Sequence, residues 1–120
     1  MKNIKKLSEN LNEMVTKGEL IDAFEKYYDD EVEVQENNSE PRVGKEVNRE
    51  YQQNLVSGLM EFRGATVLNT AIGDDISITE WHLDFDHRDF GKVDRKEVSI
   101  QKWRDGKVVN EHFYYDTKET

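Results

Sequence analysis

The densest group of side chains that could do chemistry lies in the segment WHLDFDHRD, where His82, Asp84, Asp86 and His87 fall within six residues. Imidazole and carboxylate groups are metal ligands, so this segment raises the hypothesis of a metal site. In a β-strand each residue advances about 3.3 Å, so His82 and Asp86 would lie about 13 Å apart, too far to share one ion. We therefore predict no metal site, and expect these residues on a hydrated or dimer-facing outer sheet surface.

A second candidate is Glu111, in the alternating segment VVNEHFYY near the end of the chain. If Glu111 shares an apolar sheet face with Phe113, loss of hydration would raise its pKa and make it a usable general acid or base near neutral pH. Gln101 and Ser99 could then bind a substrate carbonyl. The alternative, which the sequence alone favours, is an ion pair of Glu111 with Arg95 or Lys107 at a pocket rim.

Four aromatic residues are candidates for the wall of a ligand cavity: Tyr51, Trp81, Phe113 and Tyr115. Aromatic walls with a few polar groups suit a small, largely apolar ligand. Any one of these side chains could equally belong to an ordinary core.

Three amphipathic helices must position these residues. Apolar residues recur at steps of three and four between Ile4 and Val15, and again over 19–28, with Gly18 between the two segments. A short strand is predicted over 31–35, where Val32 and Val34 alternate with polar residues. A third helix is predicted after Val43, because apolar residues then follow at steps of four, namely Val47, Tyr51, Leu55 and Leu59.

From Gly64 the apolar period changes to two, which predicts four strands, over 66–72, 76–86, 93–104 and 108–115, with a hairpin loop over 87–92. We predict one α+β domain over residues 1–120, with the helices on one face of a mostly antiparallel sheet. The turn at Asp105-Gly106 decides which residues share a face. A two-residue turn would place Ser99 opposite His112, and a three-residue turn would place it opposite Glu111.

Composition narrows the function classes. The chain has 120 residues, a formal net charge of -9, and no cysteine, which excludes disulfides and thiolate metal ligands. The negative charge argues against nucleic acid and against anionic membranes as partners. The N-terminal segment lacks an unbroken apolar stretch and a small-residue cleavage site, and no phosphate-binding glycine loop or dinucleotide fingerprint is present. We expect a cytoplasmic protein that needs no cofactor.

The segments YYDDEVEVQENNSEPRVGKEVNREY and WRDGKVVNEHFYYD resemble the SnoaL-like and ketosteroid-isomerase-like branch of the nuclear transport factor 2-like superfamily. The resemblance covers nearly the whole chain. It implies a cystatin-like cone, in which three helices of the N-terminal half pack on a strongly bent, mostly antiparallel sheet. It also implies an apolar pocket at the open end of the cone and a homodimer formed through the outer sheet face.

The resemblance also assigns site positions. The general base of the isomerases falls on Gln35, whose carboxamide cannot carry a proton near neutral pH. The neighbouring Glu36 could substitute if the strand shifts. The oxyanion-stabilising acid falls on Ser99, and its companion tyrosine falls near Leu11. The resemblance favours the three-residue turn, which places Ser99, Gln101, Glu111, Phe113 and Tyr115 together on the pocket face.

These observations give three functional hypotheses. The first is a domain that binds a small apolar or carbonyl-containing ligand, with its reaction unassigned. The second is an enzyme of the polyketide cyclase, epoxide hydrolase or isomerase type, with Glu111 as general acid or base. The third is a non-catalytic dimerisation module whose outer sheet face, near His82, Lys102 and Tyr114, carries the interaction. His112 is also expected to face outwards.

Overall fold

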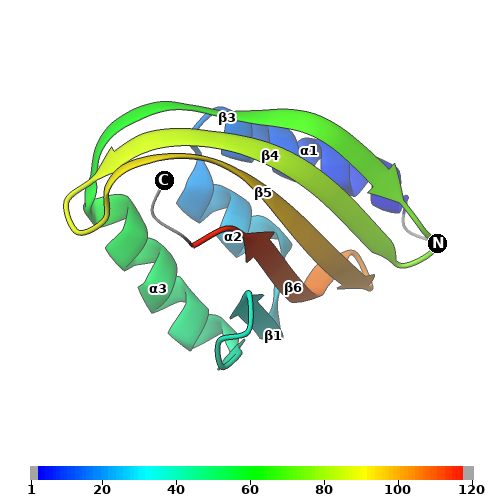
Figure 1. Ribbon diagram of the computed structural model, residues 1–120. Helices are drawn as coiled ribbons and strands as arrows, with labels where there is room; N and C mark the ends of the chain where they lie inside the picture. The colour runs from blue at the N-terminus through cyan, green and yellow to red at the C-terminus, as the bar shows by residue number, and fades with distance from the viewer. Residues whose placement is uncertain (1–2, 118–120) are drawn as a thin grey trace.

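A computed structural model describes residues 3–117 (Figure 1). These residues form three helices and six strands, in the order α1 (Ile4–Thr16), α2 (Leu20–Tyr27), β1 (Tyr28–Glu36), β2 (Arg42–Val43), α3 (Lys45–Ser57), β3 (Leu59–Ile72), β4 (Ile76–His87), β5 (Gly91–Arg104) and β6 (Lys107–Tyr115). The predicted α+β class is confirmed, and β2 is the one strand that the sequence pattern did not predict. No helix among the described residues is long and apolar enough to cross a membrane.

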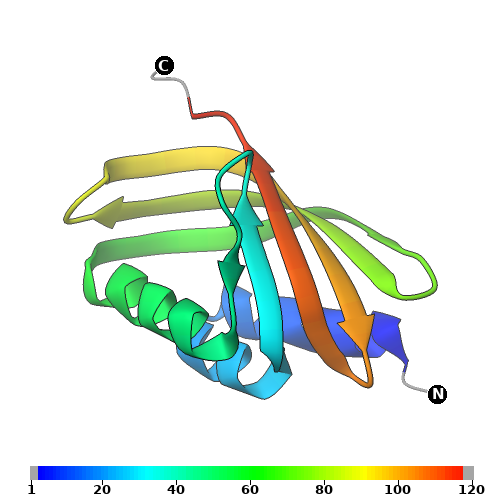
Figure 2. The same cartoon turned by 90° about the horizontal axis from the view of Figure 1, so that it is seen from below.

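The six strands form one mixed sheet with the order β2-β1-β6-β5-β4-β3. β1 runs parallel to β6, and every other pair is antiparallel. The long strands β3, β4 and β5 arch over the helices in Figure 1. In Figure 2, β1 (cyan) and β6 (orange to red) run at a steep angle to β3 (green). Register shifts along β3 and β4 accompany this bend, because a β-bulge locally increases strand twist. The sheet therefore has a concave face, on which all three helices lie.

Local interactions mark both ends of α1. The side chain of Asn3 caps α1 by accepting a hydrogen bond from the backbone N–H of Lys6 at 3.1 Å. Gly18 follows α1 with a φ of +81°, a conformation that favours glycine. The apolar sides of α1 and α2 pack into one core with β1, β5 and β6, which includes Leu11, Phe24 and Trp103. This core closes the narrow end of the cone.

The third helix begins where it was predicted, directly after Gly44, but ends earlier than predicted. It begins at Lys45, after the short strand β2, and ends at Ser57. Val47 is 52% exposed, and Leu59 already belongs to β3, so the strand begins earlier than the expected Thr66. Gly58 is the C-cap of α3, and the His87 ring leaves no room for a side chain there, since an added Cβ atom would lie 2.3 Å from Cε1 of His87. Leu59 then pairs with His87 as the first residue of β3, a contact between distant segments that local periodicity does not register.

The last hairpin has neither of the two predicted registers. Asp105 and Gly106 form a two-residue turn with φ angles of +53° and +78°, typical of the type I′ hairpin, and Arg104 pairs with Lys107. An irregularity after Lys102 then shifts the register, so Gln101 pairs with Glu111 and Ser99 with Phe113. The three-residue turn is therefore wrong. Ser99, Gln101, Glu111 and Phe113 still share one face of the sheet, as predicted. The reason is that the bulge shifts the register by one residue and so offsets the change of face that the two-residue turn alone would have caused.

Candidate functional site

A cavity of about 850 Å³ lies between the concave face of the sheet and the helices. Its wall includes Tyr51, Trp81, Ser99, Gln101, Glu111, Phe113 and Tyr115, all predicted from the sequence to face a pocket. Along the concave side of β5 the exposed fraction falls from Arg95, whose side chain is 34% exposed, to Ser99 at 2%. The cavity is therefore open beside Arg95 and closed beside Gln101 and Glu111.

Glu111 lies at the closed end and is only 3% exposed. Tyr28 donates a hydrogen bond to its Oε1 atom at 2.5 Å, and the side-chain amide of Gln101 donates to Oε2 at 2.6 Å. Burial raises the pKa of Glu111 to about 7, although both hydrogen bonds act in the opposite direction. The predicted ion pair with Arg95 or Lys107 is not formed among the described residues, because Arg95 pairs with Glu97 and Lys107 donates to a backbone carbonyl.

A chain of hydrogen bonds fixes the orientation of the Gln101 amide. The indole N–H of Trp103, which can only donate, bonds the Ser77 hydroxyl at 2.9 Å. The Ser77 hydroxyl must then donate to the Gln101 carbonyl oxygen, at 3.0 Å, which leaves the amide N–H₂ facing Glu111. Gln101 thereby holds the Glu111 carboxylate in place, and because Gln101 also lines the cavity, its contact with a substrate stays a prediction.

Gln35, the position assigned to a general base by resemblance, lies outside the cavity wall. Its amide donates to the Ser39 carbonyl at 3.0 Å. The inward residues of β1 are Val32, Val34 and Glu36, so it is Glu36 that lines the cavity. Glu36 accepts hydrogen bonds from Arg42 at 3.0 Å and from the Tyr115 hydroxyl at 2.9 Å. A carboxylate is therefore present at this edge of the pocket, one residue after the expected position.

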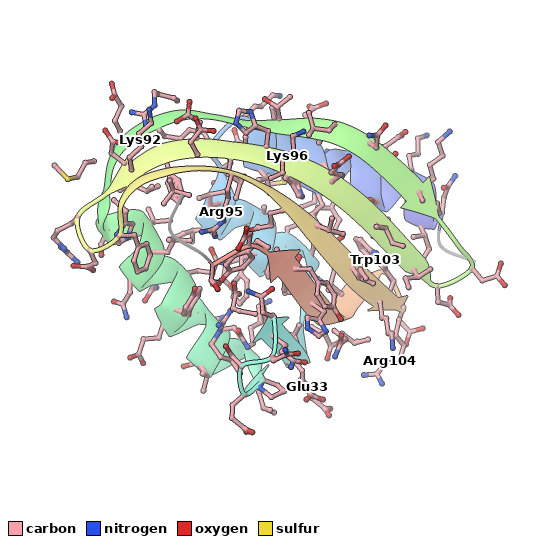
Figure 3. All side chains as sticks on the ribbon, viewed as in Figure 1. Glu33, Lys92, Arg95, Lys96, Trp103 and Arg104 are labelled. Atoms are coloured by element: carbon pink, nitrogen blue, oxygen red, sulfur yellow. The ribbon has the colours of Figure 1, made fainter. Side chains whose placement is uncertain are left out.

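Two arginines border the cavity by stacking on aromatic rings. The Arg42 guanidinium lies 3.6 Å from the centre of the Tyr51 ring, and that of Arg95 lies 3.9 Å from the centre of the Tyr115 ring. Figure 3 shows Arg95 on the concave side of the sheet. Arg95 also donates to Glu97 at 3.1 Å, and burial raises the pKa of Glu97 to about 7.

Sequence reasoning missed two of these residues. Glu97 lies two positions before Ser99 and therefore on the same strand face, so the alternation of β5 could have identified it. Tyr28 is the C-cap of α2 and the first residue of β1. Nothing in its local sequence indicates that it contacts Glu111, which is 83 residues away in the chain.

The positions of the isomerase acid and its companion tyrosine hold Ser99 and Leu11, both of which line the cavity. Both side chains are 2% exposed. Neither can act as an acidic hydrogen-bond donor of the kind that the isomerases use. The described residues therefore place one buried carboxyl group, Glu111, at the closed end of the pocket, with a different set of neighbours.

The acidic and histidine segment of β4 is divided between the two sheet faces. Asp84 and Asp86 lie on the outer face, where Arg63 bonds each of them at 2.8 Å. His82 pairs with Asp94 at 2.6 Å on the same face. His87, expected with them in an outer cluster, is instead buried at 3% exposure. Within residues 3–117, no three His, Asp or Glu side chains gather in a way that could hold a metal ion.

The hydrogen bonds of His87 fix its protonation state. Its Nδ1 atom accepts from the backbone N–H of Asp89 at 3.1 Å, so Nε2 carries the proton and donates to the Leu55 carbonyl at 3.0 Å. The neutral ring thereby ties the end of α3 to the β4–β5 hairpin. His112, also expected to face outwards, is half-buried and donates to the Asn37 carbonyl at 2.7 Å while its ring stacks on Tyr114.

Comparison with known proteins agrees with this architecture. Residues 3–115 match the family described as the SnoaL-like domain. No curated protein matches the chain. A candidate SnoaL-like polyketide cyclase from Mesorhizobium loti is 24% identical, with a TM-score of 0.84 over 95% of this chain and 100% of that one.

Two further solved structures share the fold at lower identity. A candidate isomerase from Bacillus subtilis is 16% identical, with a TM-score of 0.78 over 97% of this chain and 90% of the other. A nuclear transport factor 2-like protein of unknown function from Burkholderia pseudomallei is 10% identical, with a TM-score of 0.80 over 98% and 93% of the two chains. At these identities the likeness shows the fold alone.

Proposed function

The chain belongs to the SnoaL-like domain family, and from that premise we propose that its cone binds a small, largely apolar molecule. The observation that carries the proposal is the cavity of about 850 Å³, whose wall contains the aromatic side chains of Tyr51, Trp81, Phe113 and Tyr115. Ligand sites are typically clefts of this size with mostly apolar walls and a few fixed polar groups. Polar side chains, among them Arg95, Gln101 and Glu111, are also part of this wall and can fix the orientation of a bound molecule.

A substitution that narrows the cavity tests this proposal. Leu83 lines the cavity, whereas its neighbour His82 lies on the outer face. A thermal-shift screen of apolar carbonyl compounds should find ligands that raise the melting temperature. The variant Leu83→Trp should lose that response, and the control His82→Trp should keep it. The proposal fails if no compound stabilises the protein, or if Leu83→Trp responds like the unaltered chain.

We propose as a second function that Glu111 acts as a general acid or base on the bound molecule. The specific support is its position on the cavity wall combined with a pKa raised to about 7, which lets it take up and release a proton near neutral pH. Tyr28 and Gln101 donate hydrogen bonds to the carboxylate form and hold it in place. Proton transfer of this kind suits the isomerase, cyclase and epoxide hydrolase chemistries expected from the sequence.

The activity test follows proton exchange at the carbon next to a ketone. Deuterium loss from α-deuterated ketones that bind the cavity should show a rate that rises with an apparent pKa near 7. Glu111→Gln should abolish the exchange without abolishing binding. An exchange rate that is unchanged in Glu111→Gln would contradict the catalytic role while leaving the binding function intact.

The homodimer remains a prediction. The outer sheet face offers Tyr114, which is 44% exposed, together with His82 and its partner Asp94. Light scattering at micromolar concentration should give twice the monomer mass, and Tyr114→Lys should shift the mass towards the monomer. A monomer under all conditions would remove both the dimer and the dimerisation-module hypothesis.

A further inference from the structure

The guanidinium of Arg95, at the open end of the cavity, lacks a hydrogen-bond partner on one of its buried atoms. Nε of Arg95 is the one buried side-chain nitrogen or oxygen, among residues 3–117, that has no partner. Buried donors without acceptors are rare, and each one calls for an explanation such as an absent ligand. Arg95 also lines the cavity and its side chain is 34% exposed, so a molecule inside the cavity can contact its guanidinium group.

The surroundings of Arg95 hold the group in place but leave most of its donors free. A guanidinium has five N–H groups in a planar fork, and Glu97 accepts from one nitrogen at 3.1 Å. Stacking on Tyr115, at 3.9 Å, fixes the plane of the fork without using any N–H. The other cavity arginine differs, because Arg42 bonds both Glu36 and Asn48. Arg95 is therefore the arginine with spare binding capacity.

We infer that the cavity ligand carries a carboxylate, and that Arg95 binds it through the N–H groups of its guanidinium at the open end. A planar carboxylate matches the arginine fork with two parallel hydrogen bonds, which a neutral carbonyl cannot do. The apolar body of the ligand then lies between Trp81 and Phe113, with its far end towards Glu111. The inference rests on the proposed binding function and names the class of ligand: elongated apolar carboxylic acids.

A cationic ligand is the main alternative, because Glu36, Glu97 and Glu111 also line the cavity. Two observations count against it. The Tyr51 and Tyr115 rings, which would form an aromatic site for a cation, are already covered by Arg42 and Arg95. Glu36 already accepts hydrogen bonds on both of its oxygens. The group in the cavity wall that has spare hydrogen-bonding capacity is the Arg95 guanidinium, which can only donate. A ligand that matches it must therefore carry a hydrogen-bond acceptor.

Three fluorescent probes that differ only at one end test the inference: 4-(1-pyrenyl)butyrate, the corresponding primary amide, and the corresponding amine. In fluorescence titrations the butyrate should bind about tenfold more tightly than the amide, because a charge-assisted hydrogen bond is stronger than a neutral one. Arg95→Met should remove this difference. The control Lys102→Met, on the exposed opposite face of β5, should preserve it.

A second variant guards against a loss of folding in Arg95→Met. Glu97→Gln removes the carboxylate that competes for Arg95, so it should tighten butyrate binding and leave amide binding unchanged. Equal affinities for butyrate and amide, tightest binding of the amine, or a butyrate preference that survives in a folded Arg95→Met variant would each overturn the inference. Failure of all three probes to bind would instead count against the proposed binding function.

Discussion

The substitution Glu111→Gln should change how the stability of the protein depends on pH. The folded-state pKa of Glu111 is raised from 4.5 to about 7 by burial. As pH rises from 4.5 to 7, the unfolded chain therefore releases this proton while the folded chain retains it. The free energy of unfolding should fall over this window and level off above pH 7, because the unfolded state binds fewer protons.

The magnitude follows from the same two pKa values. At about 1.4 kcal/mol per pH unit, a rise from 4.5 to about 7 corresponds to about 3 kcal/mol of stability lost between pH 4.5 and pH 8. A glutamine cannot ionise, and it can keep both neighbours: its carbonyl accepts from Gln101, and its amide donates to the Tyr28 oxygen. The variant should therefore lose this part of the pH dependence and be the more stable protein at pH 8.

Urea denaturation followed by tryptophan fluorescence, between pH 5 and pH 8, measures the difference between the two chains. The exposed Glu33 on β1 provides a matched control, since Glu33→Gln should leave the pH dependence unchanged. Other carboxyl groups titrate in both proteins and cancel in the comparison. If Glu111→Gln shows the same pH dependence as the unaltered chain, Glu111 ionises at an ordinary pH and the described site is wrong.

Two further substitutions test how the site is held together. Gly58→Ala should destabilise the fold by about 1–3 kcal/mol in the same denaturation assay, because its methyl group would clash with the His87 ring. Its control, Gly64→Ala, should not destabilise the fold, because no atom lies within 4 Å of the added carbon. Ser77→Ala should cost about 1–3 kcal/mol because it leaves a buried indole N–H without an acceptor, and the exposed Ser57→Ala is its control. Equal effects within either pair would contradict the corresponding contact.

The division of the sheet into two faces could be predicted from the sequence, because it follows from alternation within single strands. Trp81, Ser99 and Glu111 share the concave face for this reason. Alternation also contained information that the resemblance overrode. Val32 and Val34 face inwards, which by itself places Glu36 in the cavity and Gln35 outside it. For this position, the alternation of inward and outward residues along β1 was a better guide than the alignment to the family motif.

The features that could not be predicted depend on contacts between distant segments. The bulge after Lys102 sets the pairing of Gln101 with Glu111 and interrupts the alternation of β6, but two adjacent valines at this point hide the interruption in the sequence. The last turn of α3 is bonded by the ring of His87, and the environment of Glu111 depends on Tyr28. In each case the deciding partner lies on another element, so no local pattern carries the information.

The two tryptophan indole N–H signals in a ¹H–¹⁵N spectrum offer the most direct test that the cone binds a ligand. Trp81 lines the cavity, whereas the indole of Trp103 is bonded to Ser77 behind it. Titration with a compound that stabilises the protein should move the Trp81 indole signal in a saturable way and change that of Trp103 much less. If the compound stabilises the protein while the Trp81 signal stays in place, binding occurs elsewhere and the cone is not the site.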